Sequence, residues 1–517
     1  MSSFISKITL GFILSLALQA HAEKVVFLEK AQESLQARYD LITSAQKTIE
    51  AQYFNVDNDR ISISSLALLR DAALRGVKVR ILVDSMNNLL PRELMAALIS
   101  DVDTGKSLNI EIRSFNQFNI ANPLCYTRRM HDKALIIDGQ YLVVGDRNVA
   151  NGYYDQEAKS SSSESLPIFE GMDVLLAGSA SQQALSYFNQ RWNSKDVKSI
   201  NMYEYSHEKI HDPATCTYTE SNSAVCEQKR RDDVALLKSE IKKLEDSKKR
   251  IESGKGLVQA KSGINWLANA YETSDVKFIH DEVTSVCKGK SEQNIGAEIY
   301  KTIDENTQES LLITTPYLVV TQQMQSLMTK LVDRGVKVRI ITNSLESNDV
   351  AGAHAGYLKT RHQLLNLKNE KSGGSVKIYE FSNIEKGTFV TLHAKMILMD
   401  NKKVFVGSYN WDFRSQNLNS EVGVLIGLSG VKKSSSVSAV RERLADFLRT
   451  SDLVSLKEVN SDNQSTTPAF LSMPVITKNL SADDLNKAIE VSTDRKNNVG
   501  FWNSLLKLEF LGLIEQL

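Results

Sequence analysis

The sequence lacks an excess of charge of either sign. Lysine and arginine together number 62, and aspartate and glutamate also number 62, in a chain of 517 residues. A protein that binds nucleic acid usually carries a marked basic excess, so we do not expect nucleic acid as a partner. The rest of the composition, 42% hydrophobic and 24% charged, is typical of a globular protein long enough for two or three packed domains.

Long apolar runs are also scarce near the N-terminus, where a spanning helix would need about 20 apolar residues. The run at residues 8–18 is shorter, and it precedes Ala20-His21-Ala22, the small-x-small pattern of a signal-peptidase site. We therefore expect cleavage after Ala22 and export of the mature protein. No cysteine follows the run, so a lipoprotein is not expected.

Cysteine is rare, and none of the four cysteines has the spacing of a metal site or of a catalytic thiol. Export would permit disulfides, and four cysteines allow three connectivities. Cys216 and Cys226 could staple a loop, which would leave Cys125 and Cys287 to pair or to stay free. We predict structural roles for all four.

What the sequence does contain is an internal repeat. The heptapeptide RGVKVRI occurs at residues 75–81 and again at 334–340, each time after a helical pattern and before an apolar strand. The stretch HDKALIID at 131–138 likewise has a counterpart, HAKMILMD, at 393–400. The two offsets are almost equal, so the chain carries two copies of one α/β unit in tandem.

Each copy presents the same polar side chains from adjacent strands. His131 and Lys133 share one face of a predicted strand, as do His393 and Lys395, and a glycine-x-x-asparagine follows in each copy, ending in Asn148 or Asn410. Imidazole can act as a nucleophile or as a general acid and base. Paired with lysines and amides around a phosphoryl group, the two histidines predict phosphodiester chemistry at a pseudo-two-fold axis, with no metal and no cofactor.

Each histidine also needs an acceptor for its other ring nitrogen, to fix its tautomer and orientation. Glu421 and Asp173 each follow their motif at the start of another apolar strand, so we predict them as the two orienting acids.

At these residues the sequence resembles the phospholipase D superfamily, whose signature is two H-x-K-x4-D motifs with a downstream G-x-x-N. Within it the chain is most similar to bacterial cardiolipin synthases of the C type, over nearly the whole mature chain. The resemblance implies a covalent phosphohistidine intermediate, with His131 as the nucleophile and His393 as general acid and base. It also counts Asp138 and Asp400 among the catalytic residues, although Asp138 fits a structural turn role better. One departure is Asp146, which stands where the subgroup usually has glycine; it could weaken anion binding or face away.

The resemblance implies two phospholipase D-like α/β/α sandwich domains related by a pseudo-two-fold, with the active site at their interface. The predicted organisation is a signal peptide at 1–22, a first domain at 23–205, a linker with a charged helix at 206–275, a second domain at 276–450 and an extension at 451–517. The helix has apolar residues at heptad-like spacing and should lie on the domain surface (Leu237, Ile241, Leu244, Ile251). The apolar last seventeen residues are expected either to lie in the membrane interface or to pack on the second repeat.

The leading functional prediction is cardiolipin synthesis from phosphatidylglycerol and a second phospholipid, by an exported bacterial protein peripherally attached to the periplasmic side of the inner membrane. Alternatives are an exported phospholipase D that yields phosphatidic acid, a metal-independent phosphodiesterase or nuclease, and a scaffold without chemistry. The pattern HEKIH at 207–211 resembles a zinc-protease motif. Because Pro213 would end the required helix, a metalloprotease is not expected.

Overall fold

The computed structural model describes residues 22–102, 104, 106–154, 168–200, 223–253, 257–292, 294–385, 388–428, 440–442, 445 and 451–453. The signal peptide apart from Ala22, the pattern at 207–211 and the last seventeen residues lie outside this set, and their predictions stay predictions. Among the described helices, none is both long and apolar enough to cross a membrane.

The first half comprises the strands and helices up to the end of the long charged helix. Its strands are β1 (Glu23–Leu28), β2 (Thr48–Tyr53), β3 (Lys78–Asp84), β4 (Ser100–Asp101), β5 (Lys106–Ser107), β6 (Ile110–Phe115), β7 (Lys133–Ile137), β8 (Tyr141–Gly145), β9 (Ile168–Glu170), β10 (Asp173–Ala177) and β11 (Val197–Ser199). Its helices are α1 (Ala31–Ser44), α2 (Arg60–Leu74), α3 (Arg92–Ile99), the 3-10 helix η1 (Pro123–Thr127), α4 (Asn151–Tyr154), α5 (Ser179–Trp192) and α7 (Ser223–Glu252).

The second half comes after the charged helix in the chain. A connecting strand, β12 (Tyr271–Thr273), pairs with β1 of the first half. The strands of the second half are β13 (Val276–His280), β14 (Ser310–Thr314), β15 (Lys337–Asn343), β16 (Lys368–Asn369), β17 (Gly374–Phe381), β18 (Asn383–Glu385), β19 (Thr388–Leu392), β20 (Met396–Met399), β21 (Lys403–Gly407), β22 (Val422–Gly427) and β23 (Ser451–Leu453). Its helices are α8 (Ile295–Asn306), α9 (Gln322–Asp333), α10 (Ala351–Thr360), α11 (His362–Leu365) and α12 (Phe413–Asn417).

Each half is built on one mixed sheet, and the two sheets share the same central strand order, although their edges differ. The first runs β11-β6-β3-β2-β7-β8-β10-β1-β12, and the second runs β13-β22-β21-β20-β14-β15-β17-β16, with β23 also pairing with β17. In both, three parallel strands (β2, β3 and β6; β14, β15 and β17) adjoin an antiparallel set that begins with the motif strand, β7 or β20. The predicted tandem repeat of two α/β domains is therefore confirmed.

The repeated RGVKVRI heptapeptide forms the same helix end twice. Gly76 and Gly335 have φ angles of +96° and +92°, in the left-handed region that glycine adopts without strain. After α2, Val77 N–H donates to Ala72 O at 3.1 Å, and Val336 makes the same bond after α9. These caps satisfy the last carbonyls and turn the chain directly into β3 or β15.

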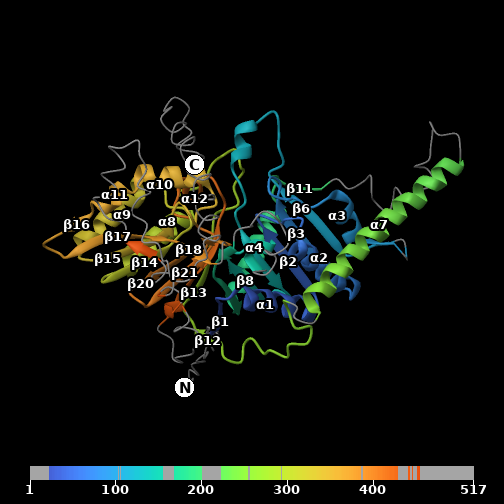
Figure 1. Ribbon diagram of the computed structural model, residues 1–517, viewed down its shortest axis with the longest axis horizontal. Coiled ribbons are helices and arrows are strands. Elements are labelled where there is room, and N and C mark those ends of the chain that lie inside the picture. The colour runs from blue at the N-terminus through green and yellow to red at the C-terminus, as the bar shows by residue number, and fades with distance from the viewer. Residues whose placement is uncertain are drawn as a thin grey trace, which may run out of the picture.

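Three large apolar layers form the core, and one of them joins the two halves. One core lies between the first sheet and α1, α2 and α3, and another lies between the second sheet and helices that include α8 and α9. The third joins the inner faces of both sheets, for example Ile136 of β7 and Met396 of β20, with Tyr187 and Phe188 of α5. Figure 1 shows the halves side by side, the first in blue to teal and the second in yellow to orange.

The charged helix α7 lies on the outside of the first half, along α2 and α3 (Figure 1). Leu237, Leu244 and Ile251 are buried, and Lys248 forms an ion pair with Asp71 of α2. The predicted amphipathic helix on the domain surface is therefore present.

A disulfide joins Cys125 of the first half to Cys287 of the second, across 162 residues of sequence. From the sequence alone, these two cysteines could either pair or stay free. Cys216 and the side chain of Cys226 lie outside the described part of the chain.

Candidate active site

The two motif histidines lie at corresponding edges of the two sheets. His131 precedes β7 and His393 precedes β20, at the edge where the parallel strands β2 and β14 end. Both side chains are nearly buried, with 7% and 4% of their surface exposed. This is the edge at which ligands bind in open α/β sheets.

The backbone just before each histidine pairs with the other half. Met130 forms a β-bridge with Ser420, and Leu392 of β19 pairs with Glu170 of β9. His131 N–H donates to Ser420 O at 2.9 Å, and His393 N–H donates to Glu170 O at 2.7 Å. Each half therefore fixes the backbone of the other half's histidine, and the site lies between the two halves.

Each histidine ring is also held by a carboxylate from the opposite half. His131 Nδ1 lies 2.9 Å from Glu421 Oε2, and His393 Nδ1 lies 3.3 Å from Asp146 Oδ1. Glu421 accepts further hydrogen bonds from the hydroxyls of Ser408 and Ser415, and Asp146 accepts one from Met172 N–H. A carboxylate on Nδ1 leaves Nε2 as the reactive nitrogen and stabilises an imidazolium when it forms.

The predicted orienting role fits Glu421, but the structure does not bring Asp173 to His393. Asp173 lies beneath the site, where its carboxylate accepts from Ser34 Oγ at 2.6 Å, Arg38 Nη1 at 3.0 Å and Arg147 Nη1 at 3.1 Å. Asp146, which the sequence marked only as a departure, takes the place against His393.

The strand register explains this exchange. Met130 pairs with Ser420 and Leu392 pairs with Glu170, so the residues that follow, Glu421 and Gly171, occupy corresponding positions. The first half has no side chain at that position. A Cβ built at Gly171 would lie 2.1 Å from Asp146 Oδ1. Asp146 itself corresponds to Ser408. At these two positions the second half has serine and glutamate, whereas the first half has aspartate and glycine.

The two motif lysines lie beside the histidines. Lys133 Nζ donates to His131 O at 2.8 Å, and Lys395 Nζ donates to His393 O at 2.9 Å. Both side chains are buried. Burial, together with the positive charge of Lys395, lowers the pKa of Lys133 to about 7, and burial lowers that of Lys395 to about 8. Two buried cations at one site are stabilised by an anion, such as a phosphodiester, placed between them.

The same environment keeps both histidines neutral. Burial and then the charges of Lys133 and Lys395 lower the pKa of His131 well below its usual value, and burial with the same two lysines does so for His393. Burial raises the pKa of Glu421 to about 7, and burial also raises that of Asp146. A neutral imidazole is the form that can attack phosphorus.

The predicted asparagines lie nearby but are not equivalent. Asn148 donates to Tyr153 OH at 2.8 Å, and this hydroxyl lies 3.4 Å from His393 Nε2. Asn410 is buried, and its side-chain oxygen has no hydrogen-bond partner among the described residues. Tyr153 was not predicted from the sequence, because a tyrosine five residues after Asn148 is not part of any motif.

Comparisons with known proteins show the family of the chain. The family described as "Cardiolipin synthase, PLD-like domain" matches residues 39–192 and 299–438, one segment in each half. The chain belongs to this PLD-like family. The resemblance drawn from the repeated motif is thus confirmed.

Individual relatives cover most of the chain. It is 28% identical to cardiolipin synthase C of Escherichia coli K12 over 424 residues, which span 77% of this chain and 80% of that protein. It is 22% identical over 437 residues to a cardiolipin synthase of Geobacillus thermodenitrificans, covering 84% and 68% of the two chains. The crystal structure of phosphatidylserine synthase from Haemophilus influenzae Rd KW20 has the same fold, with a TM-score of 0.52, 14% identity and coverage of 93% of this chain and 97% of that chain.

The aspartates of the two PLD-like motifs lie away from the site, at the opposite ends of β7 and β20. Asp138 accepts hydrogen bonds from the backbone N–H groups of residues 46–48, and Asp400 accepts from those of residues 308–310. Both residues have positive φ angles, 54° and 48°. Asp138 and Asp400 therefore hold a turn against the loop before β2 or β14, and the prediction that they are catalytic does not fit this placement.

We expect Asp400→Ala to lower the free energy of unfolding by about 2 kcal/mol, because three backbone donors lose their acceptor. Turnover per folded molecule should stay within a factor of a few. Urea denaturation and an activity assay on the same preparation check both parts. Asp138→Ala is the matched variant in the other half, and a large loss of turnover in fully folded protein would contradict the structural role.

The buried cluster of Asp173, Arg38 and Arg147 should contribute strongly to the free energy of unfolding. Burial opposes ionisation of Asp173, but Arg38 and Arg147 outweigh it and lower the pKa of Asp173. Asp173→Asn should cost about 3–5 kcal/mol, because it leaves two buried guanidinium groups without a carboxylate. Because the folded pKa is depressed, the wild-type advantage is present above the unfolded pKa of about 4 and is lost as pH falls through the folded value. Urea denaturation at pH 7 and pH 3 checks this; equal differences at both would contradict it.

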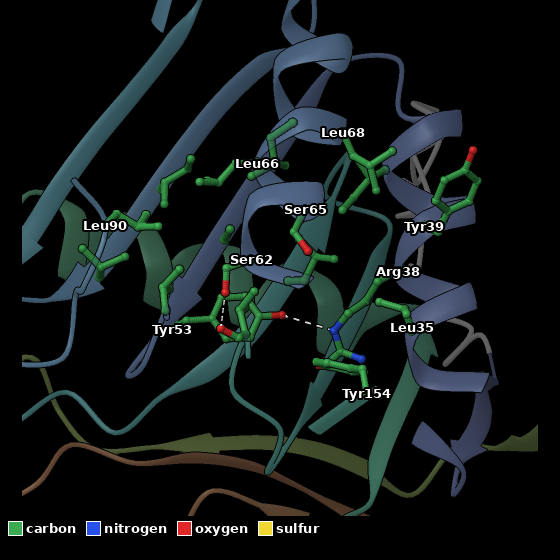
Figure 2. A pocket seen from close by; sticks show the side chains of 18 of the residues that line it. Leu35, Arg38, Tyr39, Tyr53, Ser62, Ser65, Leu66, Leu68, Leu90 and Tyr154 are labelled. Atoms are coloured by element: carbon green, nitrogen blue, oxygen red, sulfur yellow. Dashed lines mark hydrogen bonds between the residues drawn. The ribbon is translucent and has the colours of Figure 1, made fainter. Parts of the chain in front are cut away.

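An apolar pocket also lies within the first half, away from these residues. It is enclosed by α1, α2 and the sheet, and Figure 2 shows Arg38 at its wall donating to Tyr53 OH, beside Tyr154. Neither motif histidine nor either motif lysine lines it. Through Arg38 the pocket adjoins the Asp173 cluster rather than the histidine pair.

Proposed function

We propose that this protein is a phospholipid phosphatidyltransferase that makes cardiolipin from phosphatidylglycerol and a second phospholipid. The observation that carries the proposal is the pair of histidines, each anchored through Nδ1 by a carboxylate of the opposite half and flanked by a buried lysine. The named activities of the PLD-like relatives supply the substrate class.

In the proposed first step, His131 Nε2 attacks the phosphorus of one phospholipid. The P–N bond forms and the bond from phosphorus to the leaving headgroup oxygen breaks. His393, which is neutral in the empty site, takes up a proton at Nε2 as the diester anion binds, and it gives that proton to the leaving oxygen. In the second step, His393 takes the proton of an acceptor hydroxyl, whose oxygen attacks phosphorus and releases His131. With phosphatidylglycerol as the acceptor, the product is cardiolipin.

Several contacts support this division of roles. The Tyr153 hydroxyl lies next to Nε2 of His393 and can hold that nitrogen in line for proton transfer. Lys133 and Lys395 can donate hydrogen bonds and, when protonated, supply positive charge where negative charge develops on the phosphoryl oxygens; a bound diester anion favours their protonated forms. The disulfide between Cys125 and Cys287 supports export to an oxidising compartment, which we propose to be the periplasmic side of the inner membrane.

The deciding experiment incubates purified protein with vesicles of phosphatidylglycerol labelled in both glycerol groups. The proposal expects labelled cardiolipin and free glycerol in equal amounts, and an acid-labile lipid label on the protein during turnover. Phosphatidic acid as the only lipid product would show a phospholipase D. Cleavage of plasmid DNA without added metal, with the lipid left intact, would show a nuclease instead.

A further inference from the structure

The segment between β6 and β7 carries an unusual group of exposed apolar side chains. All residues from 117 to 124 are exposed. Ile120, Leu124 and Phe118 have 86%, 76% and 62% of their surface exposed, the three largest values for large apolar side chains in the described part of the chain. Soluble proteins seldom expose such side chains together without a partner for them.

The same segment carries no charge. Residues 116–127 include no lysine, arginine, aspartate or glutamate, although 24% of the whole chain is charged. The partly exposed Arg128 follows at once, and the exposed Lys288 adjoins Cys287 across the disulfide, whereas Arg129 is buried in an ion pair and does not face the surface. The segment therefore has an uncharged tip above a basic base, the pattern of an element that enters the interface of an anionic membrane.

The position of the segment places it at the site. It leaves the sheet where the parallel strand β6 ends and returns at Met130, the residue before His131. The neighbouring loop after the parallel strand β3 exposes Met86 at 45% and Leu89 at 59%. Both loops therefore leave the same edge of the sheet that holds His131. In Figure 1 the segment is the cyan projection that stands out from the body at the top.

The segment is held in its projecting form by several bonds at its base. Asn116 Nδ2 donates to Cys125 O and to Arg128 O, at 2.8 and 2.7 Å. The disulfide and a 2.7 Å hydrogen bond from Arg414 Nη2 to Thr127 O tie it to the second half. Because these bonds order the segment in advance, little conformational freedom is lost when it binds a surface.

We propose that residues 117–127, together with Met86 and Leu89, form a membrane-docking surface that inserts into the headgroup region of a phospholipid bilayer. Docking would bring the edge of the sheet at His131 to the lipid surface, so that a diester headgroup reaches the histidines without leaving the bilayer. The choice of a bilayer as the occupant rests on the proposed lipid substrate and on the uncharged tip with its basic base.

The test compares two double variants of the full chain. Ile120→Ser with Leu124→Ser removes the tip, whereas Leu74→Ser with Ile264→Ser removes two exposed apolar side chains elsewhere, 52% and 47% exposed. Co-sedimentation with vesicles of phosphatidylethanolamine and phosphatidylglycerol should show at least about tenfold weaker binding for the tip variant only. Thermal unfolding should be unchanged in both, since these side chains are exposed.

Two further measurements separate this proposal from the proposed function. Turnover of vesicle phosphatidylglycerol should fall with binding in the tip variant, while turnover of a short-chain, monomeric phosphatidylglycerol should be unchanged. The fluorescence of the tryptophan introduced in an Ile120→Trp variant should shift to shorter wavelength when vesicles are added. If vesicle binding persists in the tip variant, or falls equally in the control variant, the proposed docking surface is wrong. If vesicle binding falls as expected but the wild-type protein turns over no lipid, only the proposed function is wrong. A tip variant that loses a dimer in solution yet still binds vesicles would show a protein interface instead.

Discussion

Replacing either His131 or His393 with alanine should lower turnover by at least about ten-thousandfold, since the proposed mechanism then loses its nucleophile or its general acid and base. The double variant should be no worse than the single ones, because the two groups act as one unit. Initial rates with the phosphatidylglycerol vesicles of the assay above measure this. Circular dichroism should show that all three variants are folded.

The choice of control matters because both histidines are buried. His362→Ala changes a partly exposed histidine at the start of α11 and should keep full activity. Protein labelling distinguishes the two roles: His393→Ala should still carry some acid-labile lipid on His131, whereas His131→Ala should carry none. Equal labelling of both variants would overturn the assignment of His131 as the nucleophile, and unimpaired turnover in either variant would remove the histidines from the mechanism.

Replacing Asp146 with serine should lower turnover by about a thousandfold, because the His393 ring loses the carboxylate that fixes its tautomer and stabilises its protonated form. The pseudo-symmetry also predicts a rescue. Adding Gly171→Glu to Asp146→Ser reproduces the serine and glutamate that the second half uses at Ser408 and Glu421. We expect this double variant to recover a large part of the lost activity in the vesicle assay.

Gly171→Glu alone is the matched control for the rescue. The three nearest atoms to a Cβ at Gly171 all belong to the Asp146 side chain, so glutamate fits only after that side chain is shortened. The single variant should therefore be impaired and destabilised, and the double variant should be the more active of the two. If the double variant is no better than Asp146→Ser, the correspondence between the two halves does not extend to the orienting acid.

The fold was predictable because its signal is repeated. A duplicated heptapeptide with glycine at a helix end, and a duplicated strand that places His131 and Lys133 on one face, define two equal α/β units without any knowledge of their packing. A histidine and lysine pair that occurs twice in one chain also suggests a shared site, and the structure places each histidine within reach of a carboxylate from the opposite half.

The acid that contacts His393, which comes from the first half, was not predictable in the same way. Asp173 begins a strand after its motif, as Glu421 nearly does, but it lies two residues further along the paired strand, or about 7 Å. That distance carries its carboxylate from the interface to Arg38 and Arg147. Only the register of β9 with β19 shows that Gly171 is the true counterpart and that Asp146 fills its place.

By itself, the sequence determined the repeated α/β fold, the two histidines and the lysines beside them, because those features follow from local periodicity and from a motif that occurs twice. The tertiary structure alone decided which carboxylate faces each imidazole, that Asp138 and Asp400 pin turns at the far ends of their strands, and that Cys125 joins Cys287. The physical reason is that these contacts connect residues 90 or more positions apart, and their partners are set by how two sheets pack rather than by any pattern along the chain.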